Sequence, residues 1–188
     1  MATQSHYLYV RQPQLEKSYK NYIIHYAKIA QEKRVEIFCL GTEWEKFVIS
    51  RPLFWENLIK ELRKIYTGQL TYAANWDEYP KVGFWKELDF IGVDAYFPLS
   101  SSITPNKEVL LKALEPFKQM LEQFSDSTAK PVLFTEYGFR SKDKAAEKPW
   151  ESDKAGQVNL QGQVNCYQAF YETFWKENFI AGGFLWKW

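Results

Sequence analysis

Residues 35–43 carry the stretch that decides the fold: Val-Glu-Ile-Phe-Cys-Leu-Gly-Thr-Glu. Its apolar, β-branched first part predicts a buried strand over 35–40, which leads through a Gly-Thr pair into the acid Glu43. Residues 131–136 have the same form, an apolar run followed by a threonine and Glu136. The carboxyl ends of parallel strands lie at one edge of a sheet, and functional groups gather there. We therefore expect Glu43 and Glu136 to lie on one rim.

The rest of the chain alternates between strands and helices. Apolar runs predict further strands over 70–74, 90–96 and 180–186. Helical spacing predicts a helix opened by Pro13, a helix capped by Ser50, a short helix near 82–88, a helix over about 106–125 with a kink at Pro116, and, after a polar loop over about 137–156, a last helix that ends near 178. No hairpin signal stands between the strands, so an α/β fold with a parallel sheet is predicted.

Two architectures have such a sheet: a doubly wound open sheet and a (β/α)₈ TIM barrel. No glycine-rich phosphate-binding motif follows any predicted strand, and acids stand there instead, which favours the barrel. A complete barrel needs eight strands in roughly 250 residues. We count about five βα units, and therefore expect residues 1–188 to be a single but incomplete barrel domain, part of a longer protein.

Composition narrows the classes of function. The 188 residues are 46% hydrophobic and 25% charged, which is typical of a globular domain. A net charge of +1 predicts no nucleic-acid partner, and no apolar run approaches the ~18 residues of a membrane span. No signal peptide is visible, and the localisation stays open. Cys39 and Cys166 are interpreted as small buried hydrophobes, and the absence of a His/Cys/Asp cluster predicts neither a metal nor another cofactor.

Two carboxylates on one rim are the groups that cleave glycosidic bonds, one as acid and the other as nucleophile or base. Simpler interpretations exist for both. Glu43 could be a surface acid at a helix start, although Glu45 fits that role better. Glu136 could be the buried ion-pair partner of Arg140. The catalytic interpretation is favoured for both glutamates.

Other side chains near the predicted strand ends suit a sugar site. Tyr96 follows the strand next to Glu136, and its hydroxyl could hold that carboxylate in place, unless it is simply a solvated rim aromatic. Asp94 lies two residues before Tyr96 and points to the same face, as a site hydrogen-bonder or as part of a buried pair. Asn75 could reach a sugar hydroxyl, or could only form a turn.

Aromatic residues make up 18% of the chain, with eight Trp. Most are expected to fill the core. Four Trp residues fall in turns beside the predicted strand ends: Trp44, Trp76, Trp150 and Trp186. A flat apolar ring suits the face of a sugar, and Trp76 and Trp186 are the strongest candidates for such platforms. Arg140 and Trp150, in the loop after Glu136, are expected to shape an outer subsite.

Five segments in order resemble glycoside hydrolase family 113: Gly41–Glu43, Asn75–Trp76, Phe90–Leu99, Phe134–Ser141 and Gly182–Trp186. That family belongs to a clan of retaining (β/α)₈ glycosidases and is similar to endo-β-1,4-mannanases. The resemblance covers roughly residues 14–188 and implies that the chain holds the fourth to the eighth barrel strands. It further implies that Glu43, after the fourth strand, is the acid/base, and that Glu136, after the seventh, is the nucleophile.

The leading prediction is a retaining glycoside hydrolase that acts on a β-linked oligo- or polysaccharide by double displacement, with β-1,4-mannan as the expected substrate. One alternative is a β-1,4-glucanase or xylanase-type hydrolase of the same clan, and another is a non-catalytic carbohydrate-binding or vestigial barrel fragment. Five strands cannot close a barrel, so open sheet edges are expected to favour self-association. Hydrolysis by the isolated chain is expected to be negligible, because half of the rim is missing.

Overall fold

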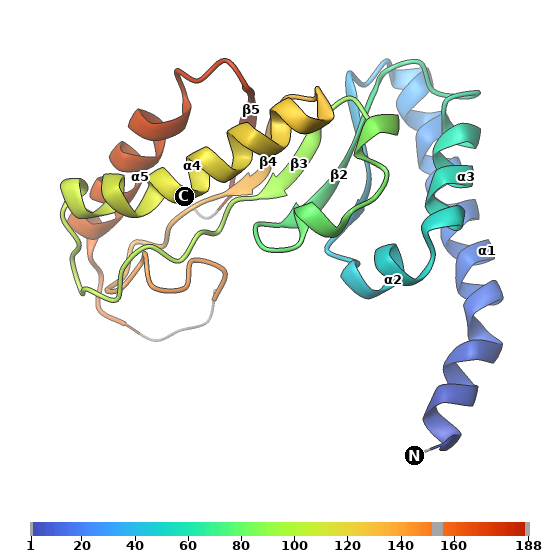
Figure 1. Ribbon diagram of the computed structural model, residues 1–188, viewed down its shortest axis with the longest axis horizontal. Helices are drawn as coiled ribbons and strands as arrows, with labels where there is room; N and C mark the ends of the chain where they lie inside the picture. The colour runs from blue at the N-terminus through green and yellow to red at the C-terminus, as the bar shows by residue number, and fades with distance from the viewer. Residues whose placement is uncertain (1, 152–155, 187–188) are drawn as a thin grey trace.

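The chain folds as a parallel sheet covered by helices (Figure 1). The computed structural model describes residues 2–151 and 156–186, with side chains from residue 13 onward. Within these ranges the strands form one five-stranded sheet in the order of the chain: β1 (Ile37–Thr42), β2 (Gln69–Asn75), β3 (Ile91–Asp94), β4 (Val132–Tyr137) and β5 (Ile180–Leu185). All neighbouring pairs are parallel, as the sequence predicts. Successive right-handed crossovers in such a sheet place the connecting helices on one face.

One helix precedes the first strand and the others stand between strands along the chain: α1 (Ala2–Lys33), α2 (Glu45–Ser50), α3 (Pro52–Leu62), α4 (Lys107–Thr128) and α5 (Leu160–Phe174). Two short 3₁₀ turns, η1 (Tyr79–Lys81) and η2 (Trp85–Glu87), lie between β2 and β3. Asparagine side chains cap the two long helices that follow β3 and β4. Asn106 accepts a hydrogen bond from Val109 N at 2.9 Å, and Asn159 accepts one from Gly162 N at 2.8 Å.

Several predicted element boundaries are wrong. Pro13 does not open α1 but lies inside it. Ser50 ends α2, a helix that the sequence analysis missed, so Arg51 precedes α3 and offers no side-chain cap. Pro116 lies inside α4, which runs three residues beyond the predicted end at 125. The predicted helix near 82–88 is only the short 3₁₀ turn η2. Of the predicted polar loop, residues 152–155 lie outside the described residues.

The hydrophobic core lies between the sheet and the helices. Alternate residues of β2 (Leu70, Tyr72 and Ala74) are buried there against apolar side chains of α3, α4 and α5. The other face of the sheet lines an open cavity of about 240 Å³ with mostly small or polar side chains: Ile37, Cys39, Thr42, Thr71, Ala73, Thr135, Glu136 and Phe184. Cys166 is buried in α5 but Cys39 is exposed on this open face, which corrects the expectation that both thiols are buried.

The two ends of the sheet are open in the described part of the chain. There β1 pairs only with β2, and β5 pairs only with β4. Phe184 in β5 is 56% exposed, as is Trp186 just after it. Edge strands of this kind present unpaired backbone groups. Self-association through these edges stays a prediction.

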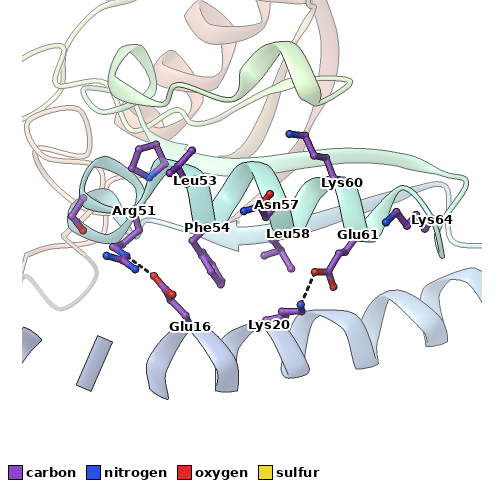
Figure 2. A pocket seen from close by; sticks show the side chains of 12 residues that line it. Glu16, Lys20, Arg51, Leu53, Phe54, Asn57, Leu58, Lys60, Glu61 and Lys64 are labelled. Atoms are coloured by element: carbon purple, nitrogen blue, oxygen red, sulfur yellow. Dashed lines mark hydrogen bonds and ion pairs between the residues drawn. The ribbon is translucent and has the colours of Figure 1, made fainter. Parts of the chain in front are cut away.

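A second cavity of about 650 Å³ lies outside the sheet, between α1 and α3 (Figure 2). Two ion pairs cross this groove: Arg51 with Glu16, and Lys20 Nζ with Glu61 Oε1 at 2.5 Å. Surface pairs contribute about 0–1 kcal/mol each, so the apolar contacts carry most of the packing between the helices. The lining of this groove includes none of the residues at the carboxyl ends of the strands.

None of the helices in the described ranges combines the length and the apolar character that a membrane span requires.

Candidate active site

A cavity of about 830 Å³ opens at the carboxyl ends of the strands. Its lining brings together residues from the ends of all five strands and the loops behind them: Glu43, Asn75, Trp76, Asp77, Glu78, Tyr96, Glu136, Trp150 and Trp186. Seven of these are residues that the sequence analysis selected. Asp77 and Glu78 were missed, although two acids that directly follow a predicted strand were a visible signal. Asp94 and Arg140 do not line the cavity.

The register of the sheet aligns part of the site. Asn75 at the end of β2 is opposite Asp94 at the end of β3, and Asp94 is opposite Glu136 in β4. The register shifts between Val93 and Asp94, so that Glu136, and not Thr135, lies opposite Asp94. Such irregularities near strand ends re-aim side chains, here toward the cavity.

Glu136 is held by a tyrosine from the neighbouring strand end. The Tyr96 hydroxyl donates a hydrogen bond of 2.7 Å to Glu136 Oε2. Burial of Tyr96, together with the hydrogen bond to this carboxylate, raises the pKa of the phenol well above its ordinary value. The hydroxyl therefore remains protonated and remains a donor. A carboxylate oriented in this way keeps its other oxygen available for chemistry.

Glu43 follows a distortion of β1. The pairing of β1 with β2 shifts between Cys39 and Thr42, so β1 contains one more residue than β2 there. Glu43 then has a φ of 52°, in the left-handed region that non-glycine residues rarely adopt. Its N–H donates to Ala73 O at 2.9 Å. Strained backbone of this kind costs about 1–3 kcal/mol and clusters at functional sites.

The sequence allowed a simpler, non-catalytic interpretation of each glutamate, and the geometry favours neither of these simpler interpretations. Glu45, not Glu43, stands in the first turn of α2, where its Oε1 pairs with Lys81 Nζ at 2.5 Å. No ion pair joins Glu136 to Arg140 among the described residues. Arg140 is only 8% exposed, and within the described part of the chain its Nε and Nη1 have no hydrogen-bond partner. Its expected place in an outer subsite stays a prediction.

Asp94 is fully buried at the end of β3. Its neighbours across the sheet are Asn75 in β2 and Glu136 in β4. Its Oδ1 accepts a hydrogen bond of 2.7 Å from Thr135 Oγ1, and its Oδ2 has no partner among the described residues. Burial raises the pKa of Asp94 to about 7, and the charges of Glu136 and Glu43 act in the same direction. Asp94 therefore carries a proton through mildly acidic pH and titrates near neutrality.

This burial predicts a pH-dependent stability effect for Asp94→Asn. Between the ordinary pKa of 3.8 and about 7 the native state holds a proton that the unfolded state releases, so wild-type stability falls as the pH rises. Asparagine does not titrate. The unfolding free energy of the variant relative to wild type should therefore increase by roughly 4 kcal/mol between pH 3.5 and pH 8.

Urea unfolding at both pH values measures this difference, with the exposed Asp126→Asn as the matched control. Parallel pH profiles for wild type and Asp94→Asn would contradict the assignment of a raised pKa to Asp94.

Aromatic rings line one side of the cavity. Trp76 and Trp150 are stacked, with ring centroids 6.3 Å apart and an interplanar angle of 27°. Phe117 supports Trp76 from behind in an edge-on contact at 5.7 Å. Trp186 lines the cavity from the end of β5. Trp44 lies elsewhere, stacked on Tyr19 at 4.8 Å. Rigid rings beside carboxylates are suited to the apolar faces of sugar rings.

The described residues contain no group of three or more His, Cys, Asp and Glu side chains placed to hold a metal ion. The lining of the cavity offers the carboxyl groups of four acids and the Tyr96 hydroxyl as a hydrogen-bond donor.

Comparison with known proteins places these features in a family. The sequence model of Glycoside Hydrolase Family 113 matches residues 11–188. A solved complex of a GH113 β-1,4-mannanase is 31% identical, with a TM-score of 0.78; the match covers 94% of this chain and 53% of that chain. The GH113 β-mannanase AaManA from Alicyclobacillus acidocaldarius, in complex with ManMIm, is 27% identical with a TM-score of 0.80, and the match covers 92% and 51%.

More distant structures share only the fold. A β-glucuronidase from Faecalibacterium prausnitzii is 18% identical with a TM-score of 0.66 over 92% of this chain and 28% of its own. A search among curated protein sequences finds no significant match. The chain spans about half the length of the solved mannanases that it matches. With its parallel strands in sequential order, it corresponds to part of their TIM barrel.

Proposed function

This chain belongs to glycoside hydrolase family 113, and we propose that it carries both catalytic carboxylates of a retaining β-mannanase. The observation that carries the proposal is the cavity at the strand ends, which Glu43 and Glu136 line together while Tyr96 orients Glu136. Double displacement uses two carboxyl groups, one as the nucleophile and the other as the acid/base.

In the first step, the Glu136 carboxylate attacks the anomeric carbon while Glu43 donates its proton to the departing glycosidic oxygen. A covalent glycosyl–enzyme forms, and the leaving sugar departs with its new hydroxyl. In the second step, Glu43 removes a proton from water, which attacks the same carbon and releases Glu136. The anomeric configuration is thereby retained. The Tyr96 hydrogen bond fixes the Glu136 oxygen that does not attack.

Mannan is the proposed substrate because the matched structures are described as β-mannanases, one of them solved with ManMIm. The stacked Trp76–Trp150 pair and Trp186 offer ring surfaces beside the carboxylates. A β-1,4-glucan or xylan would present similar ring faces to these side chains, so the sugar at the reacting position needs a direct test.

The test follows hydrolysis of defined manno-, gluco- and xylo-oligosaccharides, with the anomer of the first product read by NMR. We expect cleavage of manno-oligosaccharides with retention. The assay compares the 188-residue chain with a chimaera in which the unmatched segment of the solved mannanase completes the barrel. We expect negligible hydrolysis by the chain alone and measurable hydrolysis by the chimaera. An inverted product would overturn the proposed mechanism, and preference for another sugar would overturn the proposed substrate.

A further inference from the structure

The backbone that presents Glu43 is held from both sides by two tyrosines. Glu43 has its left-handed φ of 52° between Thr42, the last residue of β1, and Trp44, the residue before α2, whose φ is −98° and ψ 46°. A residue in this region returns to an ordinary conformation unless its surroundings hold it. The contacts on either side of Glu43 therefore decide where its carboxyl group lies.

On the C-terminal side, the contact comes from Tyr72 in β2. Its hydroxyl accepts a hydrogen bond of 2.7 Å from the backbone N–H of Trp44, the residue directly after Glu43. The Tyr72 ring is buried and packed edge-on against Trp55 at 5.5 Å and Phe84 at 5.7 Å. Burial raises the pKa of the phenol, so the hydroxyl stays neutral. A ring fixed in this way offers its oxygen at one place only.

On the N-terminal side, the contact comes from Tyr19 in α1. Its hydroxyl donates a hydrogen bond of 2.8 Å to Leu40 O, within the irregular part of β1. Its ring also stacks on Trp44, with an interplanar angle of 28°. The ion pairs in the groove between α1 and α3 flank Tyr19 in sequence, at Glu16 and Lys20, and seat this part of α1 (Figure 2).

Gly41 allows both tyrosines to approach the strand. A Cβ atom at this position would lie 2.7 Å from the Tyr19 hydroxyl and 2.9 Å from Cε2 of Tyr72. Real Cβ atoms do not show such distances, so any side chain here would push the two rings away. The glycine of the Gly-Thr-Glu segment is thus explained by the two tyrosines and not by its own φ.

We propose that Tyr72, supported by Tyr19, is a positioning residue that holds the turn carrying Glu43 so that its carboxyl group faces the cavity. The inference rests on the proposed function, because it assigns Tyr72 a role in proton donation by Glu43. Tyr72 touches no reacting atom and acts only through the Trp44 N–H. Its loss should therefore weaken the acid step without removing the carboxyl group.

Tyr66 supplies a matched control for Tyr72. It is equally buried, and its hydroxyl also makes one backbone hydrogen bond of 2.7 Å, which it donates to Val35 O, two residues before the start of β1. A purely structural role would give Tyr72→Phe and Tyr66→Phe the same consequences. A positioning role predicts different ones.

The first measurement is hydrogen exchange at the Trp44 amide in the 188-residue chain labelled with ¹⁵N-tryptophan. We expect Tyr72→Phe to accelerate this exchange about tenfold, because the amide loses its acceptor, and Tyr66→Phe to leave it unchanged. Tyr19→Phe is the second variant, used if Tyr72→Phe does not fold, and should also accelerate the exchange. Unchanged exchange in a folded Tyr72→Phe chain, or equal acceleration in Tyr66→Phe, would overturn the inference.

The second measurement uses the polypeptide that hydrolyses manno-oligosaccharides. Tyr72→Phe should lower kcat for them about tenfold, with KM unchanged, and should change the rate with an activated aryl mannoside less than twofold. Glu43→Gln, measured in parallel, should show the same leaving-group dependence more strongly. If Glu43→Gln shows it and Tyr72→Phe does not, the inference is wrong. If Glu43→Gln lacks it, the proposed function is wrong, and the exchange result alone decides the inference.

Discussion

Glu136→Gln should reduce the hydrolysis of manno-oligosaccharides on the order of 10⁴-fold or more, while sugar affinity is kept. The amide preserves the shape of the side chain and can still accept the hydrogen bond from Tyr96. It cannot attack the anomeric carbon, so no glycosyl–enzyme forms. Steady-state hydrolysis gives the rate, and calorimetric titration with a manno-oligosaccharide gives the affinity, both in the active polypeptide.

Glu122→Gln is the matched control, because Glu122 is an exposed acid on α4 and lies outside the strand-end cavity. It should leave rate and affinity unchanged. The experiment also separates an enzyme from a non-catalytic sugar-binding protein, which would bind the oligosaccharide without any turnover to lose. Undiminished hydrolysis by Glu136→Gln would show that another group is the nucleophile.

Glu43→Gln should produce a loss that depends on the leaving group. Departure of a sugar hydroxyl needs a proton from Glu43, so hydrolysis of manno-oligosaccharides should fall by about 10²–10⁴-fold. An activated aryl group departs with little protonation, so formation of the glycosyl–enzyme from an activated aryl mannoside should fall far less. Single-turnover kinetics measures this first step for both substrates.

Glu45→Gln is the control for this comparison. Glu45 is the first residue of α2, two residues after Glu43, and forms an ion pair with Lys81. It does not line the cavity, so its replacement removes a negative charge near Glu43 without changing the cavity lining. It should affect both substrates little. Equal losses on both substrates with Glu43→Gln would assign that residue a role other than acid catalysis.

Asp94 and the turn at Glu43 share a physical property. Both are locally unfavourable: one is a buried carboxyl with an unpaired oxygen, and the other is a non-glycine residue with a positive φ. Features that oppose stability persist where the surrounding structure supports them, and they concentrate at functional sites. Glu43 lines the strand-end cavity, and Asp94 lies in the sheet opposite two other residues of its lining, Asn75 and Glu136. The two features therefore support the proposed function independently of the family match.

Much of the fold was predictable because the strands are continuous apolar runs with helices between them. Such runs need cover on both faces, which indicates parallel βα units, and the acids after residues 35–40 and 131–134 point to their carboxyl ends.

Local boundaries were less predictable. Ser50 and Pro52 together are typical of a helix start, yet Ser50 is the last residue of α2. This helix is too short to show a periodic pattern in the sequence, and its side chains Phe47 and Val48 are buried in the folded chain.

What the sequence by itself determined is the set of groups at the rim: two glutamates after apolar runs, a tyrosine and aromatic rings near the other strand ends, in an order that resembles family 113. Order along the chain is enough for this, because parallel strands bring their carboxyl ends together whatever their exact register.

The tertiary structure alone decided how those groups are held. The bulge in β1, the αL turn at Glu43, the shift that sets Glu136 opposite Asp94, and the tyrosines that reach Leu40 and Trp44 all depend on contacts between residues far apart in sequence. Such contacts leave no local pattern, because each depends on how two separate strands or helices pack rather than on the propensity of either one.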